Sequence, residues 1–284
     1  MKAVLELIRA SYVYGAQANG HAVVNDLSLS IHQGEFVAII GENGAGKTTT
    51  SKLMNGLLKP TEGSVLVNGV PTTKLKTSAI AHAVGMLFQD PDRQICQNTV
   101  AEELAFGLKI RGLSDEEAGA RVARALEDFG FDGESAPFML SRGERQLLAL
   151  ASVVVCEPDV LILDEPTTGL DYRECMHIMS RIETLNRAGT TVVMISHDME
   201  LVFDFAKRVV AMAHGCIVAD GAPEAVFRDR FVMAKASLVP PQMIELSLRL
   251  SEDSRNKGAF DHVTSSSDML RALEAAGFEG RMVS

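Results

Sequence analysis

Apolar and polar positions follow two patterns in the first part of the chain. Residues 4–14 and 23–31 carry β-branched and aromatic side chains bounded by turn residues, which is typical of strands. The runs 36–40, 84–88 and 160–163 are instead continuously apolar, the pattern of strands buried on both faces. We therefore predict short strands joined by turns at the N-terminus, followed by the buried strands of an α/β sheet.

Helical periodicity replaces the strand pattern between about residues 91 and 150. Thr99 and Ser114 each stand three residues before a glutamate, the arrangement of a capping box at the start of a helix. Ser141 and Glu144 form a third such pair, directly before an apolar helical stretch. We expect a helical insert between two strands here.

The C-terminal part of the chain is less apolar. Residues 222–284 contain two weakly amphipathic segments, near 241–250 and 267–276, separated by a polar stretch at 251–267. We expect the polar stretch to be a flexible link. The chain is therefore divided into a main body at 1–221 and a helical C-terminal extension at 222–284.

Bulk composition excludes several classes of protein. The net charge of −10 over 284 residues argues against a general nucleic-acid-binding surface. Four scattered cysteines without a C-x-x-C pair favour free thiols in a reducing compartment. No apolar run approaches the roughly 18 residues of a membrane span, and early charges at Lys2, Glu6 and Arg9 do not fit a signal peptide. Any work at a membrane is expected to proceed through partner proteins.

The residues from Gly41 to Thr48 read GENGAGKT and fit the phosphate-binding loop of nucleoside-triphosphate proteins. The predicted strand at 36–40 precedes this loop, and a predicted helix at 49–58 follows it. Backbone N–H groups and the helix N-terminus favour phosphate, while Lys47 reaches the β- and γ-phosphates and the Thr48 hydroxyl binds Mg²⁺. A glycine-rich turn that happens to precede a lysine is the alternative, and the flanking strand and helix disfavour it.

Polar residues follow three further predicted strands. Asp164 and Glu165 end the run 160–163, where an aspartate can hold Mg²⁺ and a glutamate can polarise the water that attacks the γ-phosphate. Gln89 ends another strand, and His197 follows a strand at 190–195 from which it can hydrogen-bond a γ-phosphate. Each signal is weak alone, because such residues are more often solvated strand ends.

The order of Lys47, Gln89, Leu140-Ser141, Asp164-Glu165 and His197 along the chain resembles that of ABC-type ATPases, over about residues 3–230. The resemblance implies a P-loop NTPase fold with a mixed sheet and an antiparallel β subdomain. It also implies an inserted helical subdomain and a small helical C-terminal extension.

The resemblance also assigns roles, with Glu165 as catalytic base, His197 as the switch histidine and Gln89 as the Q-loop glutamine. Tyr14 becomes the adenine-stacking residue, although plain strand packing explains a Tyr12–Tyr14 face equally well. The predicted catalytic residues are Lys47, Gln89, Glu165 and His197, and the predicted Mg²⁺ ligands are Thr48, Gln89 and Asp164. The predicted ATP contacts are Tyr14, Asn43, Gly44, Ala45, Gly46, Lys47, Thr48, Thr49, Ser141, Arg142, Gly143, Glu144 and Asp171.

One motif departs from the family pattern. The usual signature is Leu-Ser-Gly-Gly-Gln, whereas residues 140–144 read Leu-Ser-Arg-Gly-Glu. Ser141 and Gly143, which would approach a γ-phosphate across a dimer interface, are retained. Glu144 brings a negative charge toward that anion, and we expect Arg142 and Arg145 to offset it.

Residues 89–94 and 99–107 resemble the energy-coupling factor branch of the family, which imports vitamins and transition metals. The resemblance implies an ATP- and Mg²⁺-dependent ATPase subunit at the cytoplasmic face of a prokaryotic plasma membrane. It also implies three partners: a second ATPase subunit, identical or paralogous; a transmembrane coupling subunit docked near Gln89 and the helical subdomain; and, indirectly, a substrate-binding membrane protein.

Four alternatives remain at this point: an ATPase of another ABC importer or exporter class, a soluble ABC ATPase acting on DNA or ribosomes, a P-loop kinase, and a nucleotide-binding regulator without turnover. A DNA-repair ATPase would carry a long coiled coil between Gln89 and Leu140, and that segment shows no sustained heptads. A kinase would not need Ser141 or His197, and a regulator would not need Glu165. These features favour a transport ATPase.

Overall fold

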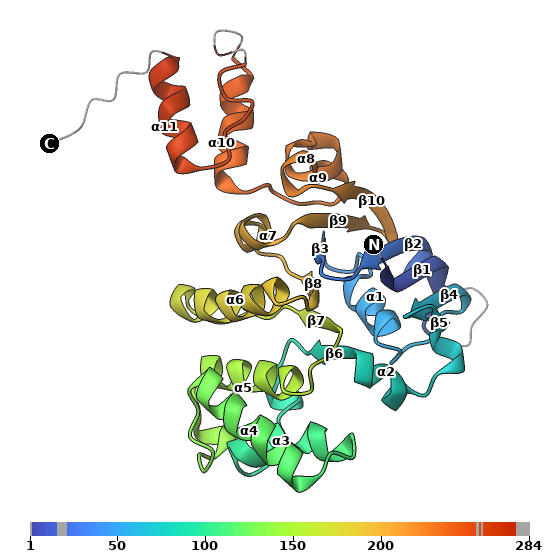
Figure 1. The fold of residues 1–284 in the computed structure, drawn as a ribbon. Coiled ribbons are helices and arrows are strands. Elements are labelled where there is room, and N and C mark those ends of the chain that lie inside the picture. The colour runs from blue at the N-terminus through green and yellow to red at the C-terminus, as the bar shows by residue number, and fades with distance from the viewer. Residues whose placement is uncertain (1, 16–21, 254–255, 257, 277–284) are drawn as a thin grey trace, which may run out of the picture.

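A six-stranded sheet forms the centre of the molecule in the computed structural model, which describes residues 2–15, 22–253, 256 and 258–276 (Figure 1). β10 pairs with β9 in antiparallel fashion and the other neighbours are parallel, so the predicted mixed sheet is confirmed. The strand order is β10 (Cys216–Gly221), β9 (Arg208–Ala213), β3 (Phe36–Gly41), β8 (Thr191–Ile195), β7 (Val160–Asp164) and β6 (Val84–Leu87).

A second, antiparallel sheet packs beside the first and confirms the predicted β subdomain. Its order is β2 (Val24–His32), β1 (Ala3–Tyr12), β4 (Glu62–Val67) and β5 (Val70–Pro71). The first predicted strand is two residues too long at its C-terminal end. Tyr14 lies beyond β1, so the two tyrosines do not share a strand face.

Alternate residues of the central strands enter two different hydrophobic clusters. In β3, Phe36, Ala38 and Ile40 pack into the cluster that includes the helical insert. Val37 and Ile39 pack into the cluster formed with the antiparallel sheet. Both faces of the strand are therefore buried, which explains its continuous apolar run.

The predicted helical insert contains three helices between β6 and β7, drawn in green beside the β6 edge of the sheet (Figure 1). Ser114 and Ser141 each form a complete capping box, and the Thr99 side chain accepts a hydrogen bond from the backbone N–H of Glu102. The helices of the insert are α3 (Val100–Ile110), α4 (Asp115–Phe129) and α5 (Arg142–Val154), with one-turn 3₁₀ helices at Pro91–Arg93 and Pro137–Met139.

The helices of the main body outside the insert are α1 (Lys47–Met54), α2 (Thr77–Ala83), α6 (Tyr172–Arg187) and α7 (Met199–Phe205), with a 3₁₀ turn at Thr72–Lys74. The helix expected at 49–58 thus begins earlier and ends earlier. α2 and α7 are seven residues each and were not predicted. Within the described ranges, no helix is both long enough and apolar enough to span a bilayer.

The described residues of the C-terminal extension form four helices where two were expected: α8 (Pro223–Arg228), α9 (Arg230–Lys235), α10 (Gln242–Ser251) and α11 (Ser266–Ala275). α10 and α11 stand side by side, away from the central sheet (Figure 1). Phe260 and Val263 are buried between them with Met269, so the described part of the predicted flexible link is packed. Residues 254, 255 and 257 of that link lie outside the described residues.

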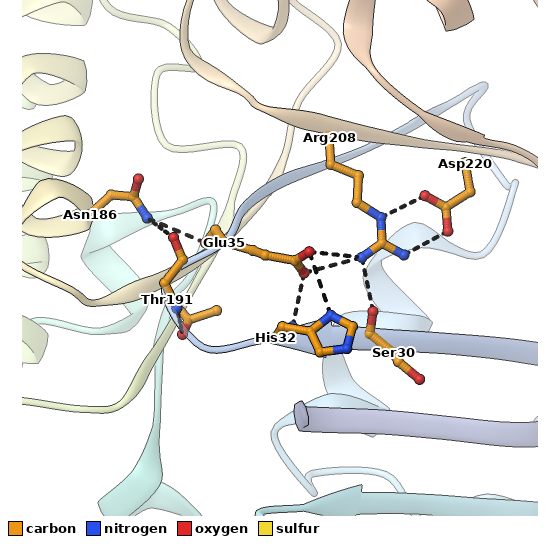
Figure 2. A network of polar contacts seen from close by, with 8 residues as sticks. Ser30, His32, Glu35, Asn186, Thr191, Arg208 and Asp220 are labelled. Atoms are coloured by element: carbon orange, nitrogen blue, oxygen red, sulfur yellow. Dashed lines mark hydrogen bonds and ion pairs between the residues drawn. The ribbon is translucent and has the colours of Figure 1, made fainter. Parts of the chain in front are cut away.

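A network of polar contacts around Arg208 joins the two sheets at the amino-terminal edge of β3 and β9 (Figure 2). The Arg208 guanidinium donates to both carboxylate oxygens of Asp220, at 2.6 and 2.7 Å. It also donates to Glu35 Oε2 at 3.1 Å and to the carbonyl of Ser30 at 3.0 Å. Because these partners belong to β10, to the turn before β3 and to β2, one side chain fixes three segments together.

Replacing Arg208 with methionine is expected to lower the free energy of unfolding by roughly 2–3 kcal/mol, because two carboxylates lose their partner in a half-buried site. Urea unfolding followed by circular dichroism measures the change. Arg9→Met is the matched control, since Arg9 pairs with Asp26 at a similar distance of 2.9 Å but is 78% exposed. That exposed pair is screened by solvent and should contribute little to the free energy of unfolding. Equal losses in the two variants would contradict the structural role given to Arg208.

Candidate nucleotide site

The carboxyl ends of four parallel strands meet at one edge of the central sheet. Asp164 of β7 is in register with Ile195 of β8, and Ile195 is in register with Ile39 of β3. The segments that follow these strands therefore converge on a cavity of about 220 Å³. The cavity brings together ten of the predicted site residues: Asn43, Gly44, Gly46, Lys47, Thr48, Thr49, Gln89, Asp164, Glu165 and His197.

The last glycine of the loop has a backbone conformation that favours glycine. Gly46 has a φ of 98°, and a Cβ there would lie 2.6 Å from the carbonyl oxygen of Val23. α1 begins at the next residue, so its N-terminal N–H groups face the cavity. Ala45 is buried and does not line the cavity, and its carbonyl accepts from the Gly215 N–H at 3.1 Å.

Lys47 places a buried cation at this loop, with only 7% of the residue exposed. Its Nζ donates to the carbonyl oxygens of Gly41 and Glu42, at 2.7 and 3.0 Å. Burial lowers the pKa of Lys47, and the negative charges of Glu165 and Asp164 oppose that shift. The loop therefore holds the ammonium group beside the cavity, where a bound anion would stabilise its buried positive charge.

Glu165 is the most constrained carboxylate in the cavity. Its backbone φ is 56°, a left-handed conformation that is unusual for a residue with a side chain and that clusters at functional sites. The Thr168 hydroxyl donates to its Oε2 at 3.2 Å, and Nδ1 of His197 lies 2.9 Å from its Oε1. Within the described residues, Oε1 has no well-aligned hydrogen-bond donor despite that close contact.

Burial raises the pKa of Glu165 to about 7, and the neighbouring charge of Asp164 adds to the shift, while the Thr168 hydrogen bond opposes it. Burial also raises the pKa of Asp164, against a hydrogen bond from Thr48. The pKa of His197 is lowered, first by burial and then by the charge of Lys47. Near neutral pH the Glu165 carboxyl is thus poised between its two protonation states, as a proton acceptor must be.

The oxygen atoms in the cavity suit a hard cation. The Thr48 hydroxyl, the Asp164 carboxylate and the Gln89 side-chain amide all line it. Mg²⁺ takes oxygen ligands, with few from the protein and the remainder from water and phosphates. The donor set therefore fits the predicted ion.

Tyr14 lies outside this cavity, at its rim. Its hydroxyl is 3.3 Å from the Thr49 hydroxyl, and its ring meets the Tyr12 ring edge-on with centroids 4.9 Å apart. The residue is 52% exposed, which leaves it accessible to a base. Adenine stacking remains a prediction.

The signature residues and Asp171 do not line the cavity. Ser141 caps α5 and Asp171 caps α6, each through a complete capping box. The Glu144 carboxylate accepts from the Ser141 N–H at 2.7 Å, and this bond lowers the pKa of Glu144. Nε of Arg145 pairs with Asp92 at 2.7 Å, and the compensation of the Glu144 charge by Arg145 stays a prediction.

Sequence reasoning missed three residues of the site, one of which, Ile195, lines the cavity from the end of β8. Thr168 bonds Glu165 directly, and Val23 lines the cavity from the segment before β2. A threonine three residues after the proposed base was the available signal for Thr168. The position of Val23 depends on its contact with Gly46 and Gly215, which no local pattern reveals.

The pKa of Glu165 predicts a pH-dependent stability of the chain free of nucleotide and metal. The folded-state pKa of about 7 lies above the ordinary glutamate pKa of 4.5, so the native state binds the proton more tightly. The resulting stabilisation is complete below about pH 4.5 and is lost as the pH rises through about 7. Glu165→Gln does not titrate, so above pH 7 it should be more stable than wild type by on the order of 3 kcal/mol.

Thermal melts between pH 4.5 and 8.5 in the presence of a chelator test this expectation. Glu144→Gln is the control of opposite sign, because the pKa of exposed Glu144 is lowered by its bonds to Ser141. That variant should be less stable than wild type at neutral pH, with the difference beginning to shrink only at the acid end of this range. A constant Glu165→Gln difference across the whole pH range would contradict the assignment.

Comparison with known proteins agrees with this geometry. The family model described as ABC transporter matches residues 24–168. The chain is 43% identical over 248 residues to the putative ABC transporter ATP-binding protein TTE1589 of Caldanaerobacter subterraneus subsp. tengcongensis, covering 87% of this chain and 44% of that protein. It is 39% identical over 251 residues to the energy-coupling factor transporter ATP-binding protein EcfA of Methanothermobacter thermautotrophicus, covering 87% of this chain and 80% of that protein. The chain thus spans less than half of the first relative but most of the second.

Solved structures give the same result. Similarity to cbiO1 from Clostridium perfringens, described as part of the ABC transporter complex cbiONQ, has a TM-score of 0.74 at 31% identity, over 87% of this chain and 99% of that one. Similarity to the ATP-binding cassette MJ0796, described as a dimer in a post-hydrolysis state bound to ADP and Pi, has a TM-score of 0.70 at 27% identity, over 77% of this chain and 98% of that one. The family match covers half of the chain, and the two solved structures cover 87% and 77% of it with the predicted fold. The chain belongs to the ATPases of the ABC transporter family.

Proposed function

We propose that this chain is the ATP-hydrolysing subunit of an importer of the energy-coupling factor type, which takes up a vitamin or a transition-metal ion. The main support for ATP hydrolysis is that four side chains converge on one cavity: Lys47, Gln89, Glu165 and His197. The branch is supported by the similarity to EcfA over 80% of that protein and to cbiO1 over nearly all of its chain.

In this proposal the glycine loop and Lys47 bind the phosphates of ATP. The loop N–H groups and the N-terminus of α1 surround the phosphates, and the Lys47 ammonium compensates the charge of the β- and γ-phosphates. Thr48, Asp164 and Gln89 would hold Mg²⁺. The ion would neutralise charge that develops on the phosphate oxygens.

Glu165 is the proposed general base. Within the described residues its Oε1 has no aligned hydrogen-bond donor, and this oxygen would accept a proton from water. The water oxygen bonds to the γ-phosphorus, the bond from that phosphorus to the β–γ bridging oxygen breaks, and Glu165 takes the water proton. His197 and Thr168 contact the two carboxylate oxygens and hold them in place.

A second copy or a paralogue would complete each site. Ser141 is exposed at the N-terminus of α5 and lies away from the cavity of its own chain, so it is available to a γ-phosphate held by a partner subunit. Asp171 is exposed at the start of α6 and would cross to that partner. In this arrangement two subunits enclose two ATP molecules.

The membrane partner is proposed to dock near Gln89 and the helical insert, on the cytoplasmic side. The insert exposes four large apolar side chains: Phe106 at 42%, Ile110 at 68%, Phe138 at 58% and Met139 at 86%. Exposed apolar groups of this size favour a protein partner over water. Closure of the ATPase dimer on ATP would then move the docked subunit, and by linkage the docked subunit would alter ATP affinity.

Purification of the tagged chain from its native membranes in mild detergent tests the proposal. A transmembrane scaffold with a small solute-binding membrane protein, with or without a second ATPase, would support the energy-coupling branch. Two large permease subunits with a separate receptor would place the ATPase in another importer class. Ribosomal proteins or nucleic acid without any membrane protein would overturn the transport function.

A further inference from the structure

Arg142, one of the two residues that depart from the family signature, contacts another segment of its own chain. Arg142 stands where the usual motif has a glycine, and its Nη2 donates to the backbone carbonyl of Thr168 at 3.2 Å. Arg142 belongs to the first turn of α5, whereas Thr168 lies in the loop between β7 and α6. A glycine at position 142 would have no side chain to make this contact.

The loop is shaped to receive the guanidinium. Gly169 has a φ of 78°, and a Cβ at this position would lie 3.0 Å from Nε and Cζ of Arg142. The two segments also touch at a second point, because a Cβ on Gly143 would overlap the Glu174 carboxylate, which closes the capping box of α6. The signature turn and the loop that follows the proposed base are therefore packed as one unit.

The contact continues to the proposed base. The backbone carbonyl of Thr168 accepts a hydrogen bond from Arg142, and its hydroxyl donates one to Glu165 Oε2 at 3.2 Å. The charged groups that face Glu165 come from other elements: Asp164 from β7, Lys47 from α1 and His197 from the segment after β8. Thr168 thus connects α5 with the Glu165 carboxylate.

We propose that Arg142 is a positioning residue that orients Glu165 of its own subunit through Thr168. The inference rests on the proposed ATPase function and extends it. Arg142 follows Ser141, which would contact the ATP bound to the partner, whereas Glu165 acts on the ATP bound to its own chain. Arg142 therefore couples the occupancy of one nucleotide site to hydrolysis at the other.

A double-mutant cycle on ATP turnover by the full chain tests this role. Arg142→Ala and Thr168→Val should each lower kcat about tenfold while KM for ATP changes less than about twofold, because base orientation and not ATP binding is lost. The double variant should be no slower than the slower single variant, within about twofold. Independent effects would multiply to a loss of about a hundredfold.

Conservative variants separate positioning from general damage. Arg142→Lys keeps a donor for the Thr168 carbonyl, and Thr168→Ser keeps the hydroxyl, so each should retain kcat within about threefold of wild type. Arg187→Ala removes the same charge from the far end of α6 and should leave kcat unchanged. Multiplicative losses in the cycle, or an increase in KM without a loss of kcat, would overturn the proposal and assign Arg142 to the ATP of the partner.

Hydrogen exchange of the peptide spanning 165–170 provides a readout that needs no turnover. Arg142→Ala should increase exchange in this segment about fivefold or more, since the loop loses a side-chain contact, and Arg142→Lys should change it less. Unchanged exchange in Arg142→Ala would overturn the positioning role. An inactive wild-type chain with the expected exchange pattern would count against the proposed ATPase function and leave the contact itself supported.

Discussion

Glu165→Gln should bind ATP and fail to hydrolyse it, with kcat reduced at least about a thousandfold. The substitution keeps the shape of the side chain and removes its capacity to accept a proton. The cavity loses a buried negative charge close to where the γ-phosphate would lie, so ATP affinity should be equal or higher. The closed dimer should therefore accumulate, because its opening depends on hydrolysis.

Two measurements check this result: phosphate release, and size-exclusion chromatography of the variant with and without ATP. A stable dimer in ATP that is absent in ADP is expected. Glu127→Gln makes the same chemical change on the exposed face of α4 and serves as the control with normal turnover. Wild-type hydrolysis by Glu165→Gln would show that another group takes the proton.

Lys47→Ala should weaken ATP binding by at least about a hundredfold, since one charge-assisted contact to phosphate in a buried site contributes on the order of 3 kcal/mol. The lysine is held by Gly41 and Glu42, so its charge is already in place before the nucleotide arrives. Its loss also removes a positive charge that interacts with Glu165 and Asp164, which adds repulsion toward the triphosphate.

Titration with a fluorescent ATP analogue measures the Lys47→Ala effect. Lys109→Ala removes the same charge from the exposed face of α3 and should bind as wild type does. Circular dichroism of both variants establishes that the fold is intact. Tight analogue binding by Lys47→Ala would refute the assignment of the Gly41–Thr48 loop to the phosphates.

The convergence of ten predicted residues on one cavity could be anticipated because its signals are local. The glycine loop and Asp164 each depend on a strand end and the residues directly after it, and parallel strands bring such ends to one edge. The order of the motifs then indicated the fold. Placing these strand-end residues together required only the assumption that their strands are parallel neighbours in one sheet.

Features that depend on contacts between distant residues were not predictable. α8 and α9 have six residues each, too few for a periodic pattern. Phe260 and Val263 lie in a polar stretch and become buried only because α10 and α11 meet. The direction of Arg142 is likewise set by Gly169, 27 positions further along the chain, and was predicted only as a compensating charge.

The strand order of the central sheet has a mechanical consequence. β3, which leads into the glycine loop, is hydrogen-bonded to β8 on one side and β9 on the other. β6, which leads to Gln89, is an edge strand bonded to β7 alone. Displacing Gln89 therefore strains fewer backbone hydrogen bonds than displacing the glycine loop. The sheet is stiffer at the loop that would bind phosphate than at the edge strand near which a partner would dock.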